Sequence, residues 1–141
     1  KATFIFSFND PSKISPILLD RLNVIKTDEF DVKDKIKIAE DYLIKEICDN
    51  IGFKQTDIIL SNEILRHIIT THTNEKGVRN FKRCLETIIS KINVLKITNN
   101  NSEILSYNIK NLTFPFELTN KHIESFLKKK EVNASYKLMY T

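Results

Sequence analysis

The sequence predicts a mainly α protein, in which four amphipathic helices pack around one core and are preceded by the last strands of an α/β sheet. Apolar residues recur at helical spacing in four segments between residues 31 and 127. Residues 2–8 instead form a mostly apolar and aromatic run, which is typical of a buried parallel strand. The chain has 141 residues, enough for one modest domain.

The first 28 residues are expected to belong to the sheet. Residues 2–8 form the first strand, residues 17–20 a short helical turn after a proline-containing loop, and residues 22–26 a second short strand. Two strands do not make a stable sheet by themselves. We therefore expect residues 1–28 to be the C-terminal piece of a larger α/β core, and the chain to be part of a longer protein.

The first long helix is predicted from Asp31 to about Asn50. Asp31 is a suitable N-cap, Asp34 favours the helix dipole in the first turn, and Gly52 ends the helix. Its apolar positions are Val32, Ile36, Ala39, Leu43 and Ile47.

Two further helices follow, and the second of them has the most regular apolar stripe. One starts at Ser61 or Asn62 and buries a face that contains Ile64, Leu65, Ile68 and Ile69. The other starts at Gly77 and ends at Asn99-Asn100-Asn101. Its stripe comprises Val78, Phe81, Leu85, Ile88, Ile92 and Leu95.

The C-terminal part predicts a small strand pair and a last helix. The strands are expected over 107–109 and 112–116, and Thr119 caps a helix that runs to about Leu127. Residues 29–130 thus form one helical subdomain with a small strand pair, and residues 131–141 form a linker or tail.

Composition excludes several classes of function. The net charge of +4 is spread along the chain, so a nucleic-acid interface is possible but not indicated. No apolar run approaches the roughly 18 residues of a membrane span. Cys48 and Cys84 are isolated, which predicts reduced thiols and an intracellular compartment, with cytoplasm and mitochondrial matrix not distinguished.

Four polar side chains at the predicted ends of elements are candidates for phosphate chemistry. Asn9 closes the first strand, Arg21 follows the short apolar turn, and Arg79 and Arg83 lie on one face at the start of the third helix. Phosphoryl transfer needs positive charge and an oriented polar group at the transferring phosphate. The structural alternatives are loop hydrogen bonding by Asn9, an Asp20–Arg21 surface ion pair and a solvated arginine face.

The order of these residues resembles the second half of the ATPase module of Lon-type AAA+ proteases. Asn9 matches the family's sensor asparagine, at the end of a core strand. The segment Ile14 to Arg21 is similar to Ile-Pro-x-Pro-Leu-Leu-Asp-Arg, and Asn74 to Arg83 is similar to Arg-Glu-Ala-Gly-Val-Arg-x-Leu-Glu-Arg. The resemblance runs from the N-terminus to about Thr98, and more loosely through Leu127.

The resemblance implies a four-helix AAA+ lid after the end of the ATPase core, and it implies roles for the four residues. Asn9 would orient the attacking water, Arg21 would be an arginine finger in a neighbouring subunit's site, and Arg79 would be the second sensor, supported by Arg83. The parent would bind ATP and Mg²⁺, form a homo-oligomeric ring, expected to be a hexamer, and unfold and translocate protein substrates for a Ser–Lys serine protease domain.

Other functions are also compatible with the sequence. The segment has two glycines, so a P-loop is impossible within it, and we expect no ATPase activity from this segment alone. The alternatives are a non-proteolytic AAA+ remodelling or DNA-handling ATPase, favoured by Lys128 where the family has a glycine, and a stand-alone helical binding module. We predict no metal site, because His67 and His72 are five residues apart and miss the spacing that shares one face of an α-helix.

Overall fold

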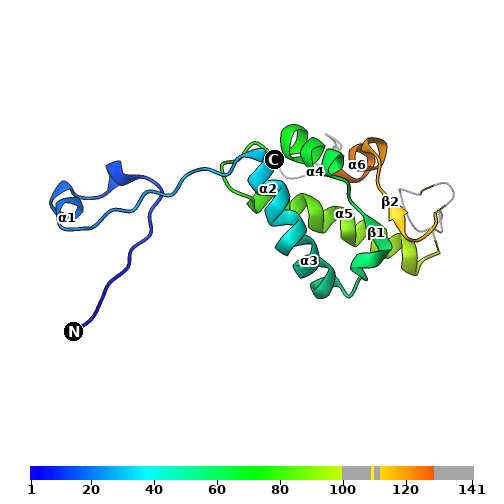
Figure 1. The fold of residues 1–141 in the computed structure, drawn as a ribbon, viewed down its shortest axis with the longest axis horizontal. Coiled ribbons are helices and arrows are strands. Elements are labelled where there is room, and N and C mark those ends of the chain that lie inside the picture. Colours follow the sequence, from blue (N-terminus) through cyan, green and yellow to red (C-terminus); the bar gives the residue numbers. More distant parts are fainter. Residues whose placement is uncertain (100–108, 110–111, 129–141) are drawn as a thin grey trace, which may run out of the picture.

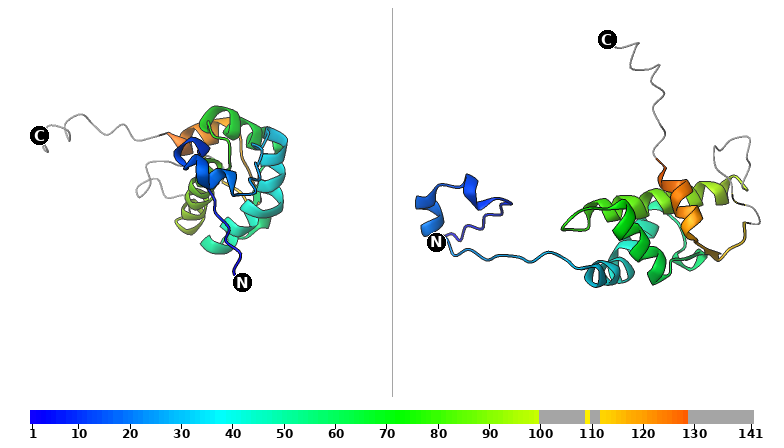
Figure 2. Two further views of the ribbon diagram at one scale, coloured as in Figure 1. Left: turned by 90° about the vertical axis from the view of Figure 1, so that its left-hand side faces the viewer. Right: turned by 90° about the horizontal axis from the view of Figure 1, so that it is seen from above.

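The structure is a computed structural model that describes residues 1–99, 109 and 112–128. Helices of residues 32–127 pack around one core, and an N-terminal arm of residues 1–30 projects away from them (Figure 1). The right-hand view of Figure 2 shows the same separation from above. The predicted fold class, a helical subdomain after a sheet-derived N-terminal segment, is confirmed for the helical part.

The first long helix is continuous from Val32 to Ile51, but its middle turn is π-helical. It consists of α2 (Val32–Ile38), η2 (Ala39–Leu43) and α3 (Ile44–Ile51). Asp31 caps it as predicted, because its Oδ1 accepts a 2.7 Å hydrogen bond from the Asp34 amide. Gly52 ends it at φ +76°, a left-handed conformation that suits glycine.

The second helix also ends in a π-helical turn. A short 3₁₀ turn, η3 (Gln55–Asp57), leads through β1 (Ile58–Ile59) to α4 (Asn62–His67), which continues as η4 (Ile68–His72). Ser61 is the N-cap.

The helix α5 (Arg79–Ile97) lies at the centre and packs against α3, η4 and α6 (Asn120–Leu127). It starts two residues later than the predicted Gly77. The side chains of one face are completely or almost completely shielded from solvent: Phe81, Leu85, Ile88, Ile89, Ile92 and Leu95. This face confirms the predicted stripe except for Val78, which is the half-buried N-cap residue of α5. None of the described helices is both long and apolar enough to cross a membrane.

Of the predicted second strand, 112–116, only Phe116 lies in a strand. β2 (Phe116–Glu117) pairs in parallel with β1, with Ile58 opposite Phe116. Both Ile58 and Phe116 are buried, so the pairing brings two distant apolar residues into the core together. Of the other predicted strand, Ile109 is buried without being in a strand, and residues 107–108 lie outside the described residues, as does the tail 131–141.

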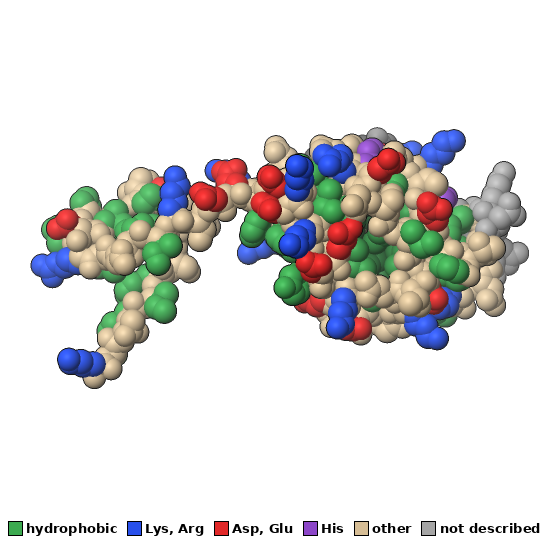
Figure 3. Space-filling view, in the orientation of Figure 1, with side chains coloured by type: hydrophobic (Ala, Val, Ile, Leu, Met, Phe, Trp, Pro, Cys, Tyr) green, Lys and Arg blue, Asp and Glu red, His purple; other side chains and the backbone are tan. Residues whose placement is uncertain are grey.

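The N-terminal arm contains α1 (Pro16–Asp20), which confirms the predicted helical turn, and a 3₁₀ turn, η1 (Pro11–Lys13). Residues 2–8 and 22–26 are not strands in this structure. They lack a neighbouring strand in the described chain, and a strand forms only by pairing. Their apolar side chains consequently face solvent: Phe4 is 76 % exposed and Ile5 92 % exposed (Figure 3).

Candidate functional site

The start of α5 presents the two predicted nucleotide-sensing arginines at the surface. Arg79 is the first residue of α5 and Arg83 lies one turn further along; both are exposed. Within the described residues, neither guanidinium has a hydrogen bond or ion pair. Both side chains are thus available for a negatively charged ligand.

The Glu75 side chain caps the N-terminus of α5, the helix that begins at Arg79. Its Oε2 accepts a 2.9 Å hydrogen bond from the Asn80 amide, and its Oε1 accepts a 2.8 Å bond from the Phe81 amide. These amides belong to the first turn, where no carbonyl within the helix is available to them. A carboxylate here also offsets the unfavourable position of a cation at the positive end of the helix dipole. The amides are occupied, so Arg79 offers its side chain rather than a bare helix terminus to a phosphate.

The loop before α5 is held from two sides. The amino group of the buried Lys35, on α2, donates to the Glu75 carbonyl. Lys76 forms an exposed ion pair with Glu29, and its carbonyl accepts from the Phe30 amide at 3.3 Å. The end of the N-terminal arm and the first long helix therefore both fix the segment that precedes Arg79.

Sequence reasoning missed Glu75 and Lys35. An acidic residue just before a helix is a recognisable signal for capping, so Glu75 could have been found. Lys35 could not, because its partner is a carbonyl 40 residues away and a lysine on a helix is ordinarily exposed.

Asn9 and Arg21 both lie on the N-terminal arm and are exposed. An open hollow between the arm and the loop before α5 has Asn9 on one wall and Lys76 and Gly77 on the other. Arg21 and Arg79 do not line this hollow. Asn9 and the loop before Arg79 thus line one open hollow, but the structure does not bring Asn9, Arg21 and Arg79 together.

Arg21 is the C-cap residue of α1, and its amide bonds to the Leu18 carbonyl at 3.0 Å. The surface ion pair with Asp20, the structural alternative for this arginine, is not formed. The Arg21 guanidinium has no partner among the described residues.

Comparison with known proteins identifies the family. Residues 49–104, from the end of α3 through β1, α4 and α5, match the family described as the Lon protease AAA+ ATPase lid domain. A Lon protease of Campylobacter concisus is 33 % identical over 141 residues, covering 100 % of this chain and 18 % of the relative. The chain belongs to the Lon protease family.

Two other Lon relatives show how widely this segment occurs. A Lon protease homolog of Acanthamoeba polyphaga mimivirus is 46 % identical over 90 residues, which is 64 % of this chain and 9 % of the relative. A peroxisomal Lon protease homolog 2 of Spinacia oleracea is 31 % identical over 117 residues, or 83 % of this chain and 13 % of the relative. The chain thus spans less than a fifth of the length of these Lon relatives.

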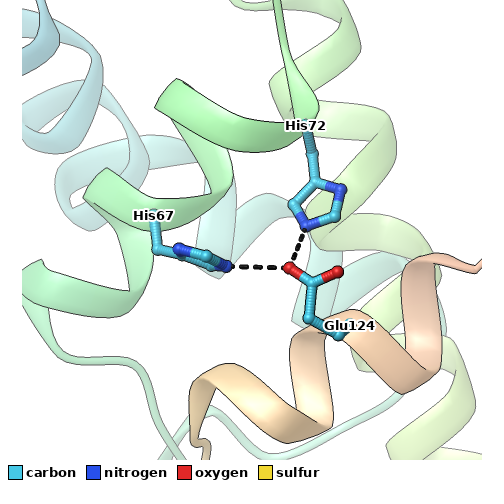
Figure 4. Close-up of side chains that lie close together, drawn as sticks. All are labelled: His67, His72 and Glu124. Atoms are coloured by element: carbon cyan, nitrogen blue, oxygen red, sulfur yellow. Dashed lines mark hydrogen bonds and ion pairs between the residues drawn. The ribbon is translucent and has the colours of Figure 1, made fainter.

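One expectation about the Lon lid is wrong. His67 and His72 were expected to miss a common face, but both Nε2 atoms lie on the same side and contact Glu124 Oε1, at 2.9 Å and 3.0 Å (Figure 4). The reason is the π-helical turn η4 (Ile68–His72). In an α-helix residues five apart are rotated by roughly 140°, whereas a π turn bonds residue i to i+5 and brings them onto one side.

The cysteines are free, in agreement with the prediction of reduced thiols. Cys48 is buried and Cys84 is half-buried, and burial raises the pKa of both thiols above the usual range. The raised pKa keeps both thiols protonated and poorly reactive at neutral pH.

Proposed function

We propose that this chain is the lid and the end of the ATPase core of an ATP-dependent Lon serine protease, which couples ATP hydrolysis to unfolding and translocation of protein substrates. The observation that carries the proposal is the match to a Lon protease over the entire chain, N-terminal arm included. The relatives described above are all Lon proteases or Lon protease homologs, which favours a protease over a non-proteolytic remodelling ATPase.

In this proposal Arg79 contacts the phosphates of ATP bound to its own subunit. Its support is an exposed, unpaired guanidinium at the start of α5, on a loop held by Lys35 and by Glu75. Loss of the γ-phosphate would remove a charge-assisted hydrogen bond and release the helix to move. Arg83, one turn away on the same face, supports the same contact.

Asn9 and Arg21 act on the transferring phosphate from two different subunits. Asn9 orients the attacking water in its own subunit, and Arg21 reaches the γ-phosphate of a neighbour as an arginine finger. This division requires a ring of identical subunits, which we propose to be a hexamer. ATP and Mg²⁺ bind to the part of the ATPase core that lies outside this chain.

The proposal is tested in the full-length protein by replacing Arg21 and Arg79. We expect Arg21→Ala to leave ATP affinity nearly unchanged and to lower the rate of ATP hydrolysis about 10³-fold, as for other arginine fingers. Arg79→Ala should weaken nucleotide binding and the coupling of binding to hydrolysis. The matched control is Arg66→Ala, an exposed arginine on α4, which should behave like the wild type.

Mixed rings separate a finger that acts on a neighbour from one that acts within its subunit. Subunits with Arg21→Ala and subunits with Asn9→Ala should each be inactive alone. Mixing them should restore part of the ATPase activity, because some interfaces then combine an intact Asn9 with an intact Arg21. Absence of recovery would refute action between subunits, and unchanged turnover in Arg21→Ala would remove Arg21 from the site.

We also infer an intracellular, reducing compartment, supported by two free cysteines. The related proteins come from bacteria, a virus and a plant, and the plant relative is named as peroxisomal, so the family alone does not select one compartment.

A further inference from the structure

Three side chains from two helical segments converge on one point away from the proposed nucleotide-facing residues. His67 ends α4, His72 ends η4, and Glu124 lies on α6. One ligand atom from each residue lies within 4.8 Å of the other two. Figure 4 shows the two imidazoles and the carboxylate directed towards a common centre.

We propose that His67, His72 and Glu124 bind a zinc ion. Two imidazole nitrogens and one carboxylate oxygen are a ligand set that zinc accepts, with bonds of about 2.0–2.2 Å in tetrahedral geometry. Such bonds place neighbouring ligand atoms roughly 3.3 Å apart. The two nitrogens lie 2.9 Å and 3.0 Å from Glu124 Oε1 and within 4.8 Å of each other. Binding the ion therefore requires the carboxylate oxygen to move away from both nitrogens and the nitrogens to lie about 3.3 Å apart.

The ligand chemistry selects the class of metal. Imidazole suits zinc and its transition-metal neighbours, whereas magnesium and calcium prefer sites made of oxygen ligands alone. Glu124 is 49 % exposed at its side chain, and the two histidines are less exposed, at 26 % and 18 %. Because the Glu124 side of the site is open to solvent, a water molecule can take the fourth coordination position of the zinc ion.

A second group supports the histidine orientation. His67 Nδ1 lies 3.4 Å from the Thr71 hydroxyl, which can accept a hydrogen bond from Nδ1–H. Metal-binding histidines commonly donate their other ring N–H in this way. Zinc on Nε2 would replace the Nε2–H hydrogen bond to Glu124 and leave the ring proton on Nδ1, which faces Thr71. The interplanar angle of 75° between the two imidazole rings lets both nitrogens approach one ion without stacking.

Metal binding would join η4 to α6 next to the loop that leads to Arg79. His72 is directly followed by Thr73, the C-cap residue of η4, and this loop carries Glu75. The ion would therefore fix one end of the segment that positions the start of α5. The site does not depend on the proposed function, since it uses none of the nucleotide-facing residues.

The test is titration of the untagged, chelator-treated chain with zinc chloride, followed by calorimetry. We expect one zinc ion per chain. His72→Gln and Glu124→Gln should each weaken binding by more than about 100-fold, because loss of even an outer partner costs about 10–100-fold. Thr71→Val should weaken binding about 10-fold. The control Glu117→Gln, an exposed carboxylate on β2, should bind like the wild type.

Two results would overturn the proposal: no zinc binding by the wild-type chain, or unchanged affinity in both His72→Gln and Glu124→Gln. X-ray absorption at the zinc edge of the wild-type complex gives a test that does not depend on variants folding. Two imidazoles and oxygen ligands are expected. Sulfur scattering would instead assign the ion to cysteine and refute the site.

Discussion

Replacing Glu75 by alanine should destabilise the lid and identify the residue that holds the start of α5. In the wild-type chain the Glu75 carboxylate accepts two hydrogen bonds, 2.8 Å and 2.9 Å long, from amides that have no other acceptor in the helix. Loss of a capping side chain costs roughly 0.5–2 kcal/mol. Loss of a negative charge at a helix N-terminus costs roughly 0.3–1 kcal/mol more.

We therefore expect Glu75→Ala to lower the free energy of unfolding by about 2 kcal/mol, from these two contributions. For a domain of this size each kcal/mol corresponds to roughly 4–8 °C in Tm, so Tm should fall by at least about 8 °C. Urea denaturation followed by far-UV circular dichroism measures the change at constant temperature.

A matched series separates capping from general loss of charge. Glu75→Gln keeps one neutral acceptor oxygen and should lose about half as much stability as Glu75→Ala. Glu40→Ala removes an exposed glutamate from the middle of a helix and should have little effect. If Glu75→Ala changes stability no more than Glu40→Ala does, the capping argument is refuted.

Three further predictions concern the same subdomain. Lys35→Met should lower the free energy of unfolding by about 1–2 kcal/mol, because it removes a buried amino group and its hydrogen bond to the Glu75 carbonyl. Because both residues hold one loop, the stability losses of Lys35→Met and Glu75→Ala should not add in the double variant, which a double-mutant cycle in urea would measure. Deletion of residues 1–28 should leave Tm nearly unchanged, because no residue of this range is buried, and a large fall in Tm would contradict a separate arm. Hydrogen bonds from His67 and then His72 lower the pKa of Glu124, so this carboxylate stabilises the fold above its ordinary pKa of about 4.3 and the contribution disappears as pH falls through the lower folded-state pKa. In chelator-treated protein the stability difference between the wild type and Glu124→Gln should therefore be largest above that range, and a difference independent of pH would contradict the assignment.

Most helices could be predicted because their signals are local. Asp31, Gly52 and Ser61 cap or end helices through contacts within a few residues, and the apolar stripe of α5 needs only a helical period. The positions of Arg79 and Arg83 follow from that helix start. Both arginines are exposed, and their roles, like those of Asn9 and Arg21, stay predictions.

The tertiary structure decided the features that depend on distant partners. Ile58 pairs with Phe116 across 58 positions of sequence, and two strands of two residues each carry too little local signal to predict this. The apolar run at residues 2–8 is strand-like in sequence, yet a strand needs a neighbour to bond with, and the described chain supplies none. The π-helical turn η4 brought His67 and His72 together, because the backbone there repeats over five residues while sequence reasoning assumed an α-helix. The sequence by itself thus determined where helices begin, end and bury a face, because these depend on residues close in the chain. Strand pairing, the buried Lys35 bond and the convergence on Glu124 required the packed fold, because each joins groups separated by 40 or more residues.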